Sequence, residues 1–322
     1  MFRYLLRRLA VLPVLLLGIT AMTFGVMRLA PGGPVDQLTD LNVKASPEIR
    51  ERLIKLYGFD KPWYQQYGRW LSRLVRGDLG RSFKDDRPVM EKIKERLPAT
   101  LLLNALSLFL IFIVAIPLGV LSAVKQNSFF DRLTTGLVFV GYSVPAFWLS
   151  LLLMIVFGLK WGWFPISGLH AINHDEMSWG TQAVDTARHL ILPVFVSAFT
   201  GLAGLSRYVR NGVLEVIRQD YIRTARAKGL SESRVIFKHA LRNALIPVVT
   251  LLGLTLPDLI GGGFLFETIF AYPGMGRLGF EAVMARDYPV VMGVGTMAAL
   301  LTMVGNLGAD FLYAVVDPRV RL

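Results

Sequence analysis

The 322-residue sequence contains no cysteine and only four histidines. Disulfide bonds, thiol nucleophiles and cysteine-based metal sites are therefore excluded. So few histidines, without any cysteine, give no recognisable Ser-His-Asp or Cys-His arrangement. The phosphate-binding pattern G-x-x-x-x-G-K-[ST] is also absent from the sequence, so the chain has no evident means of hydrolysing ATP. Together these absences argue against a catalytic role.

Acidic residues are scarce, because 23 Asp and Glu stand against 35 Lys and Arg, for a formal net charge of +12. In a soluble protein such an excess suggests nucleic acid as a partner. Here, however, 53% of the residues are hydrophobic, the mean hydropathy is +0.49, and the basic residues gather at the ends of long apolar runs. Membrane topology and anionic lipid headgroups explain that placement better. The sequence therefore predicts an all-α polytopic membrane protein that contacts lipid and binds no nucleic acid.

Six apolar runs predict six membrane-spanning helices. The first lies in the N-terminal segment 1–29, and its length and the lack of a small-x-small cleavage site argue against a secretory signal peptide. The other five spans are expected at about 100–124, 133–159, 190–206, 246–265 and 289–315, within a membrane core of residues 100–322. Pro145 should kink the third span. The loop 207–245 holds nine Lys and Arg, so it and both termini are predicted to face the cytoplasm.

Residues 30–99 form an insert between the first two spans that is too polar to cross a membrane. Helices are expected after Pro47, from Pro62 to Gly77, and from about Pro88 to Leu97. Long loops cross the membrane largely regardless of their charge, so the insert is predicted to be extracytoplasmic. Its second helix carries several aromatic residues on one side and should pack on the bundle or lie at the membrane interface.

The basic segment from Asp220 to Val248 carries no membrane run and predicts a helix-turn-helix between two spans. Asp220 and Ser231 are suitable helix caps, and Gly229 marks the turn between the two helices. Apolar residues then recur at helical spacing and predict one oily ridge: Ile236, Phe237, Ala240, Leu241 and Ala244. Such a ridge predicts a partner with a complementary groove.

This segment resembles the cytoplasmic EAA loop of ABC importer permeases, in the form carried by B-type subunits of dipeptide and oligopeptide permeases. The pattern places Arg223, Thr224 and Ala225 on the Glu-Ala-Ala triplet and Gly229 on its glycine. The Glu and the later Pro of the general pattern are missing, but TARAKG followed by HALRNALIPV is typical of the peptide branch. Further motifs follow in the same order along the whole chain: RRL, APGGPVD, GDLGRSF, GYSVPAFW, WFPISG, ETIFAYPGMGRL, RDYPV and VDPRVR.

The resemblance implies a permease subunit of a binding-protein-dependent importer, forming half of a path for di- or oligopeptides across a bacterial or archaeal cytoplasmic membrane. The implied partners are a second homologous permease, two cytoplasmic ATPase subunits that bind ATP and Mg, and an extracytoplasmic solute-binding protein. No cofactor is expected in this chain. The loop would couple the chain to the ATPases through Arg223, Thr224, Ala225, Gly229, Ile236, Phe237 and Leu241. Nickel, oligosaccharides or other solutes are alternative substrates for an importer of this type.

Asp258 lies in the middle of the fifth predicted span, where an ionised carboxylate is costly unless it faces a partner or water. It could line the path and attract a substrate ammonium group, or pair structurally with a neighbouring helix. Tyr142 and Asn104 are further candidates for the path wall, with packing as their alternative role. Asp310 is expected to pair with Arg207 or Arg210. An alternative function is a proton-coupled secondary transporter that uses Asp258.

Four residues on the predicted outer side are candidates for docking the binding protein: Trp63, Trp70, Glu267 and Asp287. The two acids could instead hydrogen-bond the ends of helices. The sequence does not separate these two roles.

Two further patterns carry no predicted chemistry. His170 and His174, followed by Asp175 and Glu176, have the spacing of metal ligands, but two histidines without a clear third ligand predict no metal site. The run Gly274–Gly279 fits G-x-G-x-x-G, yet no strand precedes it, so it predicts a tight turn at the membrane surface and no dinucleotide site.

Overall fold

A computed structural model describes residues 2–29, 47–255, 259 and 262–316 of the chain. Within these ranges the regular structure is helical, and the one extended pairing is an isolated bridge between Arg81 and Pro88. Four helices are long and apolar enough to cross a membrane: α1 (Phe2–Leu29), α5 (Val89–Val124), α8 (Trp179–Ile217) and α16 (Tyr288–Val316). The predicted class, a multi-pass helical membrane protein, is confirmed.

The third predicted span is a sharply broken pair of helices. α6 (Phe129–Ser143) is followed by α7 (Ala146–Leu153), which continues into the π-helical segment η1 (Met154–Lys160). The two parts meet at an angle of 102°, and together they are long enough for a fifth crossing or a re-entrant loop. Val144 adopts extended angles because the ring of Pro145 disfavours helical angles in the residue before it. The predicted proline kink is therefore a right-angled corner.

The fifth predicted span is represented by α12 (Ile246–Thr255). The next described helices are α14 (Phe264–Ile269) and α15 (Met275–Met284). Asp258 lies outside the described residues.

The insert between the first two spans contains α3 (Pro47–Tyr57) and α4 (Trp63–Val75). A separate helix over Pro88–Leu97 was a wrong expectation, because these residues form the first part of α5, which continues through Pro98. Val89 and Ile93 are buried against α15, and this packing keeps the beginning of α5 helical. α4 lies against α1, where the hydroxyl groups of Tyr67 and Thr20 are 2.9 Å apart. α4, the aromatic helix of the insert, therefore packs on the bundle, which was one of the two positions predicted for it.

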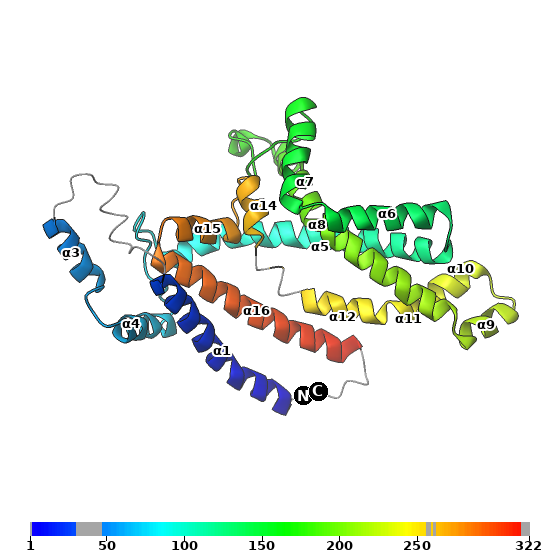
Figure 1. Cartoon of the computed structure of the whole chain (residues 1–322), viewed down its shortest axis with the longest axis horizontal. Helices are drawn as coiled ribbons and strands as arrows, with labels where there is room; N and C mark the ends of the chain where they lie inside the picture. Colours follow the sequence, from blue (N-terminus) through cyan, green and yellow to red (C-terminus); the bar gives the residue numbers. More distant parts are fainter. Residues whose placement is uncertain (1, 30–46, 256–258, 260–261, 317–322) are drawn as a thin grey trace.

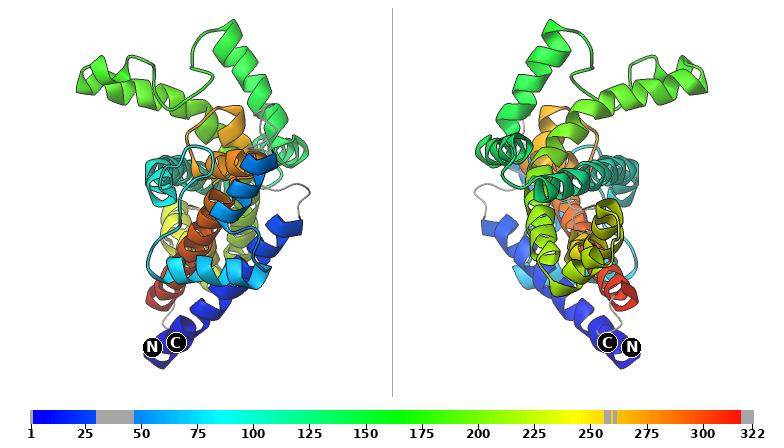
Figure 2. Two further views of the ribbon diagram at one scale, coloured as in Figure 1. Left: turned by 90° about the vertical axis from the view of Figure 1, so that its left-hand side faces the viewer. Right: turned by 90° about the vertical axis from the view of Figure 1, so that its right-hand side faces the viewer.

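The helices form an elongated body in which α5, α6 and α8 pack together and α16 packs against α1 and α12 (Figure 1). The small helices α14 and α15 lie near the beginning of α5, and α9 and α10 lie near its end. α7 and the first turns of α8 diverge from this body in both views of Figure 2. Residues of distant motifs are thus gathered at the two ends of the long helices.

An ion pair joins the turn between α5 and α6 to α8. Arg210 donates two hydrogen bonds to the carboxylate of Asp131, at 2.7 and 2.8 Å. Ser122 and the backbone N–H of Asn127 complete the set of donors to Asp131. The predicted pairing of Asp310 with Arg207 or Arg210 lies outside the described side chains. The polar head of Arg210 is satisfied by a residue 79 positions earlier in the chain.

α5 and α8 approach closely at Gly119. A Cβ atom at this position would lie 2.6 Å from the carbonyl oxygen of Ser206 and 2.7 Å from Cβ of Val209. Small residues permit such approaches between membrane helices, where dispersion contacts replace the hydrophobic effect as the driving force. The contact sits beside a core that includes Ala115, Val120 and Val213.

We expect Gly119→Ala to separate α5 from α8 and to lower stability by about 1–3 kcal/mol, the usual cost of overpacking. Gly136→Ala in α6 is the matched control, because a Cβ there meets nothing within 4 Å. The control should be neutral or stabilising by up to about 1 kcal/mol through helix propensity. Thermal unfolding of the detergent-solubilised protein measures both, and equal melting temperatures for the two variants would contradict the close packing.

Candidate functional site

The loop expected to couple the chain to a partner folds as a set of short helical segments at one end of the long helices. These are α9 (Asp220–Ala227), α10 (Glu232–Arg234), the π-helical η3 (Val235–Ala240) and α11 (Leu241–Ala244). Gly229 adopts φ +76° between α9 and α10, in the left-handed region that other residues rarely occupy. The predicted helix-turn-helix with Gly229 at the turn is confirmed.

The predicted apolar ridge of this loop faces mainly inward. Ile236 is 6% exposed and packs in one core with Val209 and Val213 of α8. Ala240 is buried with Ile222 of α9 inside the loop. A ridge that is free along its whole length was therefore a wrong expectation, because the chain's own helices cover most of it.

Phe237 is the member of the ridge that remains outside, at 60% exposed, while Leu241 is half-buried. The π-helical geometry of η3 contributes to this division, because a wider turn places residues differently from the α-helical spacing used for the prediction. Of the triplet at the start of the loop, Arg223 and Thr224 are exposed and Ala225 is buried. These loop segments thus offer two exposed aromatic side chains, Phe237 and Tyr221, among polar and basic ones.

An ion pair closes the loop across its turn. Arg226 donates to both carboxylate oxygens of Glu232, at 3.0 and 2.6 Å. The hydrogen bond from Arg226 lowers the pKa of Glu232 below its usual value, and the same contact raises the pKa of Arg226. Both side chains are partly exposed, so the pair contributes little to stability and serves mainly to hold the two helices in register.

A pocket of about 380 Å³ lies between part of the loop and the ends of α5 and α8. It is lined by Ala123, Val124, Gln126, Leu214, Ile217, Arg218, Arg223, Arg226, Glu232 and Ile236. Beside it, Ile236 remains in direct contact with the α5–α8 core. A displacement of the loop would therefore act on both long helices.

At the opposite end, the carboxyl group of Glu267 caps α15. Its Oε2 accepts a hydrogen bond from the backbone N–H of Arg277, at 2.8 Å, and the carboxyl group also accepts the N–H of Gly276. Its Oε1 accepts one from the hydroxyl of Thr100 on α5, at 3.1 Å, and that hydroxyl accepts the N–H of Met275 at 2.7 Å. The first three N–H groups of α15, which have no partner within their own helix, are all satisfied in this way.

The glycines of the run Gly274–Gly279 make room for this carboxyl group. A Cβ on Gly274 would lie 2.2 Å from Cδ of Glu267, and one on Gly276 would lie 2.7 Å from the backbone nitrogen of Phe264. Gly274 is the residue at which α15 begins. The tight turn predicted for this run is thus a helix start, and its glycines serve a close approach between segments of the same chain.

Glu267 is fully buried, at 0% exposed. Burial raises the pKa of its carboxyl above the usual value, and the donors from Arg277, Thr100 and Gly276 oppose that shift without cancelling it. Since the folded pKa is raised, ionisation of this group opposes folding as the pH rises through it. Both oxygens of the carboxyl group stabilise the fold as hydrogen-bond acceptors.

Asp287 is also buried, at 2% exposed, and holds a loop of the insert. Its carboxylate accepts hydrogen bonds from the hydroxyl of Ser82, at 2.5 Å, and from the backbone N–H of Phe83, at 3.0 Å. Glu267 and Asp287 therefore cannot meet a docked protein in this structure, and that prediction is wrong for both. For Glu267 the alternative, a hydrogen bond to a helix end, is the correct one. Trp63 is exposed on α4 and Trp70 is half-buried.

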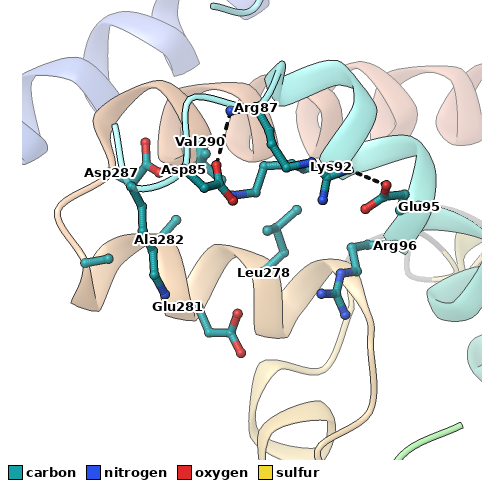
Figure 3. A pocket seen from close by; sticks show the side chains of 12 residues that line it. Asp85, Arg87, Lys92, Glu95, Arg96, Leu278, Glu281, Ala282, Asp287 and Val290 are labelled. Carbon is teal, nitrogen blue, oxygen red and sulfur yellow. Dashed lines mark hydrogen bonds and ion pairs between the residues drawn. The ribbon is translucent and has the colours of Figure 1, made fainter. Parts of the chain in front are cut away.

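Figure 3 shows a charged pocket of about 150 Å³ between the beginning of α5 and α15. Lys92 and Asp85 form an ion pair at its wall, at 2.7 Å. Burial would raise the pKa of Asp85, but hydrogen bonds from Lys92, Ser82 and the Arg87 N–H outweigh it and lower the pKa to about 2. Because the pKa is depressed, the stabilisation is present above its ordinary value of 3.8 and is lost as the pH falls toward 2. The pocket keeps its charges at neutral pH.

The three candidates for the path wall are not brought into one described site. Asn104 on α5 donates a hydrogen bond to the carbonyl oxygen of Leu259, at 2.8 Å. It therefore ties α5 to the chain next to Asp258, which is not itself described. The Tyr142 side chain is exposed on α6, and its hydroxyl lies beside Gly204 of α8, 3.1 Å from where a Cβ would stand.

Comparison with known families and proteins gives one consistent answer. The family of binding-protein-dependent transport system inner membrane components matches residues 115–322, and the N-terminal region of such components matches residues 1–104. The oligopeptide transport system permease protein AppB of Bacillus subtilis is 46% identical over 322 residues, covering all of both chains. The dipeptide transport system permease protein DppB of Escherichia coli is 41% identical over 337 residues, covering all of this chain and 99% of that one.

A solved structure shares the fold. A chain of the MetNI methionine ABC transporter, solved in inward-facing conformations, aligns with a TM-score of 0.56 and 21% sequence identity. The alignment covers 71% of this chain and 97% of that chain. At this identity the likeness concerns the fold alone.

Removal of the Glu267 carboxyl group should lower the stability of the folded protein. In Glu267→Ala the buried donors of Gly276, Arg277 and Thr100 lose their acceptor, at about 1–3 kcal/mol for each group left unsatisfied. Glu267→Gln keeps an acceptor oxygen and should be much milder.

The control for this prediction is Glu281→Ala, since Glu281 lies on the same helix with its side chain 45% exposed and pairs with Arg277. Melting temperatures of the three variants in detergent measure the effect. If Glu267→Ala melts with the wild type and loses only transport, Glu267 acts at a surface and the capping role is wrong.

Proposed function

The chain belongs to the family of binding-protein-dependent transport system inner membrane components, and we propose that it is the permease subunit of an ABC importer for di- or oligopeptides. One observation carries the proposal, namely full-length similarity at 46% and 41% identity to an oligopeptide and a dipeptide permease. The chain forms half of the translocation path. Nickel, an oligosaccharide or another solute is the alternative substrate, to be decided by uptake measurements.

The proposed topology has six spans with both termini in the cytoplasm. The loop 207–245 faces the cytoplasm because nine Lys and Arg lie in it beside three acids. The insert with α3 and α4 and the pocket of Figure 3 then lie on the extracytoplasmic side. There Trp63, exposed on α4, remains a candidate contact for a solute-binding protein, together with the half-buried Trp70 of the same helix.

The proposed partners are a second homologous permease, two cytoplasmic ATPase subunits and an extracytoplasmic solute-binding protein. ATP and Mg are bound and used by the ATPase subunits. Asp258, Tyr142 and Asn104 are proposed for the wall of the path between the two permeases, where Asp258 offers negative charge to a substrate ammonium group.

Coupling is proposed to run through the loop that holds Gly229. Phe237 enters a groove of an ATPase subunit, as in other helix-in-groove contacts, and the exposed basic residues around it meet acidic groups at the rim. Since Ile236 lies in the α5–α8 core, movement of the docked loop carries the ends of both helices with it. ATP-driven closure of the ATPases would then rock the spans between inward and outward states.

The experiment that tests this function is gentle extraction of the tagged chain from native membranes, with identification of the proteins that co-purify. The expected result is a second permease and ATPase subunits, together with peptide uptake that is lost when the gene is deleted and restored by the wild-type chain. Recovery of the chain alone, still active in uptake, would contradict the proposal and favour a proton-coupled transporter that uses Asp258.

Gly229→Asp is expected to leave membrane insertion intact and to reduce peptide uptake about tenfold or more, which corresponds to roughly 1.4 kcal/mol of lost coupling. The substitution places a negative charge on the exposed turn and strains its left-handed backbone. Gly77→Asp is the matched control, because Gly77 has φ +77° and, as at Gly229, a Cβ there would meet nothing within 4 Å. Equal loss of uptake in both variants would assign the effect to backbone strain.

Phe237→Ala and Ile236→Ala should separate docking from folding. Loss of the exposed Phe237 side chain should weaken co-purification of the ATPase by about tenfold, as for an aromatic anchor, with an unchanged melting temperature. Loss of the buried Ile236 side chain should lower stability by about 2–5 kcal/mol. Normal ATPase recovery and uptake with Phe237→Ala would exclude that residue as the anchor.

A further inference from the structure

The segment between η1 and α8 brings together metal-ligating side chains from two separate parts of the chain. His170 and His174 lie on this segment, with His174 opening a short 3-10 turn. Asp185 lies in the early turns of α8. One ligand atom from each of the three residues falls within 4.8 Å of the others. Among the described residues, the fold thus supplies the third ligand that spacing along the sequence did not reveal.

The two acids that directly follow His174 in the sequence do not join the cluster. Asp175 and Glu176 are exposed, and neither belongs to the cluster of ligand atoms. Asp185, 11 residues beyond His174, takes their place through an approach at 2.8 Å between the histidine Nδ1 and the carboxylate Oδ2. The rings of His170 and His174 lie close together, with centroids 3.9 Å apart and planes tilted by 31°.

Neighbouring groups hold each of these side chains in place. The backbone N–H of Ala171 donates to Asp185 Oδ2, at 2.9 Å, and Nδ1 of the buried His189 lies 3.2 Å from Oδ1. The hydroxyl of Thr186 lies 3.1 Å from Nδ1 of His170, which leaves Nε2 of that ring for a ligand. Metal ligands in proteins are oriented by outer groups of this kind.

We propose that His170, His174 and Asp185 form a zinc site that clamps this segment to α8. Two imidazoles and one carboxylate are ligands that Zn²⁺ accepts, and a water molecule would fill the fourth position of a tetrahedron. Tetrahedral zinc holds its ligand atoms roughly 3.3 Å apart, so side-chain movements of about 1 Å close the cluster around the ion. His170 is exposed, which gives the ion an access path from solvent.

The clamp has a structural consequence at the nearby end of the bundle. The backbone N–H of Gly168 donates to the carbonyl oxygen of Phe270, at 2.9 Å. Leu169 and Phe164, on the same segment, pack in one core with Phe270 and Tyr272. Zinc at the three ligands therefore fixes a segment that lies directly on the residues following α14. This site stands independently of the proposed transport function.

The test measures zinc bound to the chain purified in its native assembly through a tag without histidines. After treatment with a chelator and incubation with micromolar ZnCl₂, the wild type should hold about one zinc per chain more than His170→Ala or His174→Ala. His170→Ala is the principal variant because His170 is exposed, whereas Asp185 also carries hydrogen bonds that hold the fold. Mg²⁺ and Ca²⁺ should not compete for the site, because they prefer all-oxygen ligands.

Two controls make the result specific to this site. His239→Ala changes the histidine of the loop near Gly229, and the double variant Asp175→Ala, Glu176→Ala removes the exposed acids; both should keep the wild-type zinc content. Zinc should also slow cleavage by chymotrypsin at the exposed Trp161 and Trp179 in the wild type but not in His170→Ala. Equal zinc content in wild type and His170→Ala, or no zinc in the wild type, would overturn the proposal.

Discussion

The hydrogen bonds that Glu267 accepts join α14 to the nearby α15 and to α5, whose Thr100 lies 167 residues away in sequence. Its carboxyl group satisfies the first N–H groups of α15 and the hydroxyl of Thr100 on α5. A buried helix start without an acceptor would cost free energy for each unpaired N–H group. Gly274 is needed because the carboxyl group occupies the space of a side chain there, and Gly276 is needed because the backbone of Phe264 approaches it closely. The carboxyl group supplies the polar contacts between α14, α15 and α5, beside an apolar core that includes Ile93 and Leu278.

Buried polar side chains recur wherever the long helices are held together. Asp287 ties the insert to the beginning of α16, and Asp131 ties the α5–α6 turn to Arg210 of α8. Water is scarce in such places, so each acid is surrounded by donors from this chain. Buried acids occur at both ends of the bundle, with Glu267 and Asp287 at one end and Asp131 at the other. The end with Asp131 differs in that its loop around Gly229 also presents basic groups and Phe237 to the outside.

The loop with Gly229 packs against the long helices on one side and is exposed on the other. Its inner side shares a core with α5 and α8, which makes its position depend on theirs. Its outer side carries the exposed aromatic residues Phe237 and Tyr221. A partner that grips Phe237 would act on the long helices without an intervening flexible joint, and this is the physical basis of the proposed coupling. The histidine-containing segment at the start of α8 is packed onto the fold in a comparable way.

The sequence by itself determined the helical membrane class, the helix-turn-helix around Gly229 and the family, because these follow from the length of apolar runs, local backbone preferences and motif order. The tertiary structure decided which polar groups are buried and which meet. The sequence left open whether Glu267 and Asp287 meet a docked protein or hydrogen-bond the ends of helices, and the structure shows that both are buried. Asp131 and Asp185 carried no signal, since their partners approach only when separate helices pack. Spacing along a chain defines the faces of one helix, and the contacts between helices depend on three-dimensional packing.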